Sequence, residues 1–292
     1  MNGFSLNRDP QWLDRMYNNR ALVPDHPVCL ARLAESSSQA RKQLPCHLDL
    51  PYGGSPGQKL DVFPARGRSP RAGAPVLVMI HGGYWRAMDK SDHSYIAPVF
   101  TDAGACVVVP NYDLCPVVTV PEIAMQMVRA LAWTYRNVAR FGGDPGRITV
   151  VGHSVGGYMA ALLMTCLWKA YASDLPANLI VNALSFSGLH DLDPMCHAPF
   201  IKDLARLTPA QARDISPAFL PAPRHGVLYS VAGGDESAEF QRQSLLIQQS
   251  WGRKTVPVCE MLPGLNHFSV LEALARPGHR LNRLALELCA LG

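Results

Sequence analysis

Short apolar runs alternate with longer stretches of helical periodicity from about residue 47 to the end of the chain. Apolar runs of about four to eight residues are typical of strands, and longer stretches with a repeat of about 3.6 residues are typical of helices. The alternation predicts an α/β fold, with a mainly parallel, doubly wound sheet of about eight strands and helices on both faces. Strands are expected near residues 47–52, 58–63, 75–80, 105–110, 147–152, 179–186, 226–232 and 256–261. Helices are expected over residues 91–103, 121–140, 154–171, 236–252 and 279–291.

Two segments fall outside this alternation. Residues 1–46 precede the sheet, and residues 189–224 lie between the sixth and seventh strands. Both are expected to cover the carboxyl ends of the strands, where open α/β sheets hold their ligands; packing at the sheet edge is the alternative for residues 1–46. Residues 53–57 (Gly-Gly-Ser-Pro-Gly) separate the first two strands, which predicts an antiparallel hairpin at the sheet edge. The segment 64–74 is interpreted as a surface loop, so the whole chain is expected to be one domain.

Residues 152–156 read Gly-His-Ser-Val-Gly and carry the clearest chemical signal in the chain. They follow the apolar run 148–151 directly and precede the helix-like stretch 157–164. A strand, a tight turn and a helix in this order form a G-x-S-x-G nucleophile elbow, whose glycines allow the sharp turn. The five letters alone occur by chance in roughly one chain in ten of this length, so the context carries the argument. Ser154 is therefore the candidate nucleophile.

A second glycine motif follows the apolar run 75–80, which ends in His81-Gly82-Gly83-Tyr84-Trp85. In serine hydrolases an H-G-G loop after an early strand supplies backbone N–H groups that bind an oxyanion, and the residue after the nucleophile supplies another. Gly82, Gly83 and Val155 are thus the candidate oxyanion-binding residues.

A serine nucleophile needs a histidine base that is held by an acid. In the order Ser, acid, His, only His267 and His279 lie far enough downstream of Ser154. His267 is favoured, because it follows an expected strand, whereas His279 resembles the exposed start of the last helix. Asp235 is favoured as the acid, because it closes the strand near 226–232. The adjacent Glu236 is assigned to the first turn of a helix, and Asp191 is the alternative acid.

Three other histidines receive structural interpretations. His81 and His153 flank the two motifs and are expected to hold the loops by hydrogen bonds, and His190 is expected at the surface or in a lid. No H-E-x-x-H motif and no clustered Cys/His spacing predicts a metal site, and no glycine-rich phosphate motif follows a strand. Neither a metal ion nor a cofactor is therefore expected.

Charge and cysteine content further narrow the class of protein. The net charge is +4 without a basic run, which argues against a nucleic-acid or membrane-surface role. Residues 1–20 lack the apolar centre of a signal peptide or membrane span. Free thiols are expected in a reduced, cytoplasmic protein, because most of the eight cysteines lie in apolar patterns. These cysteines are Cys106, Cys115, Cys166, Cys259 and Cys289.

Together these motifs resemble the α/β-hydrolase superfamily and, more narrowly, the kynurenine formamidase (arylformamidase) and esterase-like families. The resemblance spans most of the chain and implies the α/β-hydrolase fold, a Ser154–His267–Asp235 triad and the oxyanion roles given above. Related esterases often have Ala at the position of Val155, which leaves the N–H donor unchanged. The segments that carry the resemblance are Tyr17-Asn18-Asn19-Arg20, His81-Gly82-Gly83-Tyr84-Trp85, Pro110-Asn111-Tyr112, Gly152-His153-Ser154-Val155-Gly156-Gly157, Gly233-Gly234-Asp235-Glu236-Ser237 and Asn266-His267-Phe268.

The resemblance implies cleavage of an aryl formamide such as N-formylkynurenine to formate and an aromatic amine, through a formyl-enzyme. Tyr84 and Trp85 are candidates to contact the aryl ring, with core packing as the alternative for Trp85. Arg20, Arg86 and Asn19 are candidates to meet the substrate carboxylate. The expected partner is a small aromatic amide or ester, and a homodimer is left open.

Two other functions compete with this one. A short-chain carboxylesterase would use the same triad, and only the shape of the pocket would separate the two. A non-catalytic binding protein with the same fold would be expected to lack a triad residue, and all three candidates are present.

Overall fold

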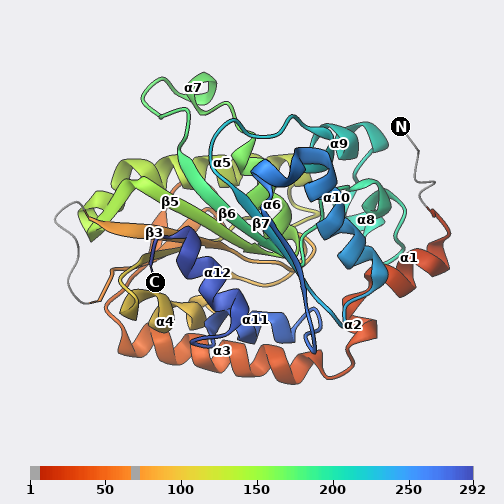
Figure 1. The fold of residues 1–292 in the computed structure, drawn as a ribbon, viewed down its shortest axis with the longest axis horizontal. Coiled ribbons are helices and arrows are strands. Elements are labelled where there is room, and N and C mark those ends of the chain that lie inside the picture. Colours follow the sequence, from red (N-terminus) through yellow and green to blue (C-terminus); the bar gives the residue numbers. More distant parts are fainter. Residues whose placement is uncertain (1–6, 67–72, 292) are drawn as a thin grey trace.

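A single eight-stranded sheet forms the centre of the computed structural model, which describes residues 7–66 and 73–291 (Figure 1). The strand order is β1-β2-β4-β3-β5-β6-β7-β8. β1 and β2 form an antiparallel pair, β2 is also antiparallel to β4, and the remaining pairs are parallel. The expected α/β fold and its antiparallel edge hairpin are confirmed. The strands are β1 (His47–Pro51), β2 (Lys59–Phe63), β3 (Ala74–Ile80), β4 (Cys106–Pro110), β5 (Gly143–His153), β6 (Ile180–Phe186), β7 (Leu228–Gly233) and β8 (Val258–Leu262).

Helices cover both faces of this sheet (Figure 1). The α-helices are α1 (Pro10–Tyr17), α2 (Asn19–Leu22), α3 (His26–Gln43), α4 (Ala97–Asp102), α5 (Val120–Asn137), α6 (Val155–Met164), α7 (Trp168–Tyr171), α8 (Lys202–Ala205), α9 (Pro209–Asp214), α10 (Ala238–Thr255), α11 (Ser269–Ala275) and α12 (Arg280–Leu288). The 3₁₀ turns are η1 (Lys90–Asp92), η2 (Ser94–Ile96), η3 (Val138–Phe141), η4 (Asp193–Cys196) and η5 (Pro217–Phe219).

The alternation of side chains along the strands divides the core into two layers. Val76, Val78 and Ile80 of β3 share one apolar cluster with α5, α6 and α10. Leu77 and Met79, which point the other way, share a second cluster with α3, α4, α11 and α12. Because side chains on a strand alternate between the two faces, one continuous apolar strand fills both layers.

Two expected helices are interrupted. The 91–103 segment forms η1, η2 and α4, because Pro98 lacks the N–H that a continuous helix would need; the α-helix starts at Ala97, with Pro98 in its first turn. The 154–171 segment splits into α6 and α7: Thr165 ends α6 and its hydroxyl donates to Leu162 O. The helices within residues 1–46 and α11 were not expected, because their short apolar patterns lie outside the alternation.

Residues 7–46 of the N-terminal segment pack closely against the rest of the molecule. Residues 1–6 lie outside the described part. Tyr17, at the end of α1, is fully buried; its hydroxyl donates to Glu239 Oε2 (2.6 Å) and its ring packs against Phe240. α3 packs on the opposite face of the sheet (Figure 1). Arg8 pairs with Asp193 at 2.7 Å, which joins this segment to the 189–224 insertion.

Removing the Tyr17 hydroxyl tests how firmly α1 is held. Tyr17→Phe should lower the free energy of unfolding by about 1.5–3 kcal/mol, since a hydrogen bond to a buried carboxylate is lost. The measurement is the urea midpoint at pH 7. The matched control is Tyr171→Phe, at a side chain that is 41% exposed, which should change stability by about 0.5 kcal/mol or less. Equal effects of the two changes would contradict the anchoring role of Tyr17.

Candidate functional site

Ser154 lies in the sharp turn between β5 and α6, where the sequence predicted a nucleophile elbow. Its φ is 57° and its ψ is −120°, a backbone conformation that a residue with a side chain rarely adopts. The hydrogen bond from Ser154 N to Phe186 O (3.0 Å) ties the turn to the end of β6. The buried Ser154 Oγ has no hydrogen-bond partner among the described residues, so it is available to react.

The flanking glycines are required by close packing. A Cβ on Gly152 would lie 2.1 Å from Gly156 O, and a Cβ on Gly156 would lie 2.1 Å from Ile80 O. Both contacts involve backbone atoms that cannot move aside easily. The G-x-S-x-G spacing therefore lets α6 start directly against the ends of β3 and β5.

The loop after β3 lies directly against the serine. A Cβ on Gly82 would lie 3.1 Å from Ser154 Cβ, and a Cβ on Gly83 (φ 106°) would lie 2.1 Å from Ala87 O. The backbone N–H groups of Gly82 and Gly83 donate to no acceptor among the described residues, and neither does that of Val155, the first residue of α6. These free donors beside Ser154 form an arrangement that can bind an oxyanion.

His267, on the loop after β8, pairs with Glu236 and not with Asp235. Its Nδ1 lies 2.7 Å from Glu236 Oε2, and the Glu236 side chain is fully buried. The Asp235 side chain is exposed, and its backbone N–H binds Leu265 O. The expectation that Asp235 holds His267 is wrong. The turn after β7, in which Glu236 N donates to Gly233 O, points side chain 236 inward and side chain 235 outward.

The second carboxylate oxygen of Glu236 is also bound. Glu236 Oε1 accepts from Gly233 N (2.6 Å) and from the hydroxyl of Ser187. Two donors on Oε1 and His267 on Oε2 fix the orientation of the carboxylate. With Nδ1 donating to Glu236, the Nε2 atom of His267 is the one left to accept a proton. No spacing rule in the sequence identified Ser187, which lies after β6.

His81, His153 and His190 are buried. His153 Nε2 lies 2.9 Å from His267 O, and the ring nitrogens of His81 lie 2.8 Å from Gly82 O and 3.0 Å from Asn111 Oδ1. Both therefore bind the backbone or side chains of the loops around Ser154, as expected. His190 was expected at the surface or in a lid, but it is fully buried, with Nε2 3.3 Å from Ser185 Oγ. His279 caps α12, as expected.

Asp191, the alternative acid, is not a partner of His267 in the structure. Its carboxylate accepts from Asp193 N (3.0 Å), and its own N–H donates to Gln243 Oε1 (2.8 Å). Both bonds serve the 189–224 insertion, so the alternative acid has a structural role.

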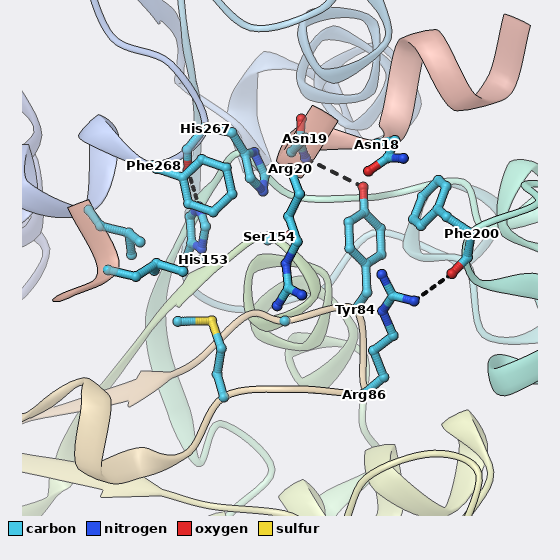
Figure 2. A pocket seen from close by; sticks show the side chains of 14 residues that line it. Asn18, Asn19, Arg20, Tyr84, Arg86, His153, Ser154, Phe200, His267 and Phe268 are labelled. Atoms are coloured by element: carbon cyan, nitrogen blue, oxygen red, sulfur yellow. Dashed lines mark hydrogen bonds between the residues drawn. The ribbon is translucent and has the colours of Figure 1, made fainter. Parts of the chain in front are cut away.

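A cavity of about 520 Å³, counted to its open mouth, contains both Ser154 and His267 (Figure 2). Tyr84 and Arg20 line it, as expected, whereas Trp85 does not: that side chain is fully buried and packs edge-on against Tyr158. A positive φ of 56° at Trp85 accompanies this inward direction. The remaining lining residues are Asn18, Asn19, Leu30, Gly83, Arg86, Met88, His153, Phe200, Phe268 and Leu271.

Both irregular segments contribute to this cavity. α2 and the residue before it supply Asn18, Asn19 and Arg20, and the 189–224 insertion supplies Phe200. Tyr84, in the loop after β3 (the oxyanion loop, residues 81–85), contacts both segments. Its hydroxyl donates to Tyr17 O (2.6 Å), and its ring meets Phe200 edge-on. Phe200 and Phe268 were missed in the sequence because no motif marks them.

Among residues 7–66 and 73–291, no group of three or more His, Cys, Asp or Glu side chains is placed to hold a metal ion. Within the same residues, no helix is long and apolar enough to cross a bilayer.

Burial of the histidines predicts loss of stability in acid. Burial lowers the pKa of His93 and of His190 to about 3, and the neighbouring His81 contributes at His93. The unfolded chain therefore binds more protons than the folded one between about pH 6.5 and pH 3. The free energy of unfolding should therefore decrease as the pH is lowered through this range, by up to about 1.4 kcal/mol per histidine per pH unit.

The urea midpoint between pH 7 and pH 5 measures this dependence. His93→Gln should make the decline shallower. His225→Gln, at an exposed histidine, is the matched control and should leave the slope unchanged. An unaltered slope in His93→Gln would rule out a contribution from this histidine.

Comparisons with known proteins agree with this architecture. The model of an α/β hydrolase fold family matches residues 77–184, which include the oxyanion loop and the elbow. The kynurenine formamidase of Salmo salar is 27% identical over 95% of this chain and 92% of its own length. Esterase LipQ of Mycobacterium tuberculosis is 36% identical over 39% of this chain and 28% of its own length.

A solved structure extends the likeness to the whole fold. A protein of Silicibacter sp. TM1040, provisionally described as a thioesterase, superposes with a TM-score of 0.79 and 28% identity, over 96% of this chain and 98% of its own. The chain has the α/β-hydrolase fold, and kynurenine formamidases and esterases are among the proteins to which it is similar.

Proposed function

We propose that the protein hydrolyses an aryl formamide, such as N-formylkynurenine, to formate and the aromatic amine. The observation that carries this proposal is a single cavity that contains a free serine hydroxyl, a histidine held by a buried carboxylate, and aromatic walls. The kynurenine formamidase homologues, which align over nearly the whole chain, support the same substrate class.

Ser154, His267 and Glu236 act as the catalytic triad. Ser154 Oγ attacks the formyl carbon while His267 Nε2 takes its proton, and Glu236 stabilises the imidazolium that forms. The negative charge that develops on the formyl oxygen is bound by the free N–H groups of the oxyanion loop and of Val155. Each such donor is worth about 3 kcal/mol in comparable serine enzymes.

The same histidine completes both halves of the reaction. The C–N bond breaks as His267 returns the proton to the departing amine nitrogen, which leaves a formyl ester on Ser154. A water molecule then attacks this ester and gives its proton to His267. Formate leaves, and Ser154 Oγ recovers the proton.

The walls of the cavity suit an aromatic leaving group. Tyr84, Phe200 and Phe268 line it, and aromatic rings prefer edge-to-face or offset contacts with one another. A Cβ on Gly82 would lie 3.1 Å from Ser154 Cβ, and this close approach of the loop favours a small acyl group such as formyl.

A substrate comparison tests the proposed function. The wild-type protein should hydrolyse N-formylkynurenine, followed by the absorbance of kynurenine, with a higher kcat/KM than p-nitrophenyl acetate. Ser154→Ala should lower both activities by about 10³-fold or more. Cleavage of the ester without cleavage of the formamide, both dependent on Ser154, would replace the proposal by a carboxylesterase with the same triad.

Substituting each of two adjacent carboxylates in turn tests which of them is the acid of the triad. Glu236→Gln should lower kcat by about 10²–10⁴-fold, because an amide in place of the carboxylate favours the wrong tautomer of His267. Asp235→Asn is the matched control, one residue away and exposed, and should stay within about threefold of the wild type. The reverse result would return the role of the acid to Asp235.

A further inference from the structure

Two arginines line the cavity that contains Ser154, and no carboxylate neutralises either of them. Arg20 reaches in from α2, and Arg86 from the position directly after the oxyanion loop (Figure 2). Among the described residues, neither guanidinium forms an ion pair with Asp or Glu. Residues 1–6 and 67–72 contain no acidic side chain that could supply one.

The two positive charges influence each other. Burial lowers the pKa of Arg86, and repulsion by Arg20 lowers it further, while only the Tyr84 hydroxyl acts in the opposite direction. Other arginines of this protein do pair with carboxylates: Arg136 with Asp174, Arg242 with Glu239 and Arg280 with Glu260. Bringing two unpaired guanidiniums into one cavity is unfavourable in the empty protein, and an anion placed between them would relieve the repulsion.

The protein's own contacts leave most of these donors unused. Arg86 Nη1 donates to Phe200 O (2.6 Å), and its guanidinium lies 5.8 Å from the centre of the Phe200 ring. Arg20 makes no hydrogen bond to a described residue and is exposed. Since an arginine has five N–H donors in a planar fork that matches a carboxylate, Arg86 can hold Phe200 and still bind an anion.

We propose that Arg20 and Arg86 form a carboxylate-binding subsite, which selects substrates that carry a carboxylate in the part of the molecule that leaves as the amine or alcohol. This inference rests on the proposed function, because the substrate that the subsite selects is the one whose bond Ser154 attacks. Phe200 contacts both Tyr84 and Arg86, so an aromatic wall of the cavity adjoins this subsite. A substrate that carries a scissile bond, an aryl ring and a carboxylate fits this arrangement.

Paired substrates with and without the carboxylate test the subsite. The first pair is N-formylkynurenine and 2′-formamidoacetophenone, which lacks the amino-acid group. The second pair is 3-(2-acetoxyphenyl)propanoate and phenyl acetate. Both are esters, so a measurement with this pair does not depend on formamidase activity. The measured quantity is the ratio of kcat/KM for the member that carries the carboxylate to the member that lacks it, in each pair, at low and at high NaCl concentration.

Arg20→Met and Arg86→Met should each lower this ratio by about 10- to 100-fold, mainly through KM, because the carboxylate is bound alike in the ground and transition states. High salt should lower the wild-type ratio and leave that of the double variant unchanged. Arg253→Met, at an exposed arginine on α10, is the matched control and should keep the wild-type ratio.

Equal losses on both members of a pair would show that the arginines only support the fold of the cavity, and would overturn the proposal. An unchanged ratio in Arg20→Met, which breaks no hydrogen bond among the described residues, would also overturn it. If neither formamide is cleaved, the proposed function fails and the ester pair still decides whether the subsite exists.

Discussion

The close approach of the β3 and β5 strand ends at the Ser154 turn is the constraint on which the site depends. Gly152 and Gly156 bring backbone atoms together where any side chain would collide, and Ser154 adopts a positive φ between them. The strain is held by the hydrogen bond from Ser154 N to β6 and by the start of α6. In return, the serine stands against Gly82 of the neighbouring loop, and its hydroxyl has no partner among the described residues.

The buried pair of His267 and Glu236 is the second constraint. A carboxylate with no exposed surface is costly unless its oxygens are bound, and Gly233 N, Ser187 and His267 together satisfy both of them. His153 binds the backbone of His267 from below, and Phe240 packs against its ring. The base is thus oriented by groups from β6, β7 and the elbow, all at the carboxyl ends of parallel strands.

Several walls of the cavity come from segments outside the sheet. α1 and α2 are fastened by Tyr17 to α10, and they carry Asn19 and Arg20 to the cavity. The 189–224 insertion brings Phe200 from the other side. Tyr84 contacts both, so the oxyanion loop and the substrate walls are built as one unit.

The sequence alone determined the sheet and the sharp turn at Ser154, and it singled out His267 among the histidines. Strand and helix periodicity is a local property, and the glycines around Ser154 and at Gly82-Gly83 have a steric cause that operates within a few residues. Those features could therefore be predicted without knowledge of distant contacts. The choice of His267 over His279 likewise followed from its place after a strand.

Only the tertiary structure decided the acid, the pocket walls and the positions of the remaining histidines. Asp235 and Glu236 are neighbours in one turn, and the direction of each side chain depends on hydrogen bonds from Gly233 and from the distant Ser187. Trp85 turns into the core and Tyr84 into the cavity, although they are adjacent. Arg20 and Arg86 meet only because α2 folds over the strand ends, an encounter between segments far apart in the chain that no local pattern encodes.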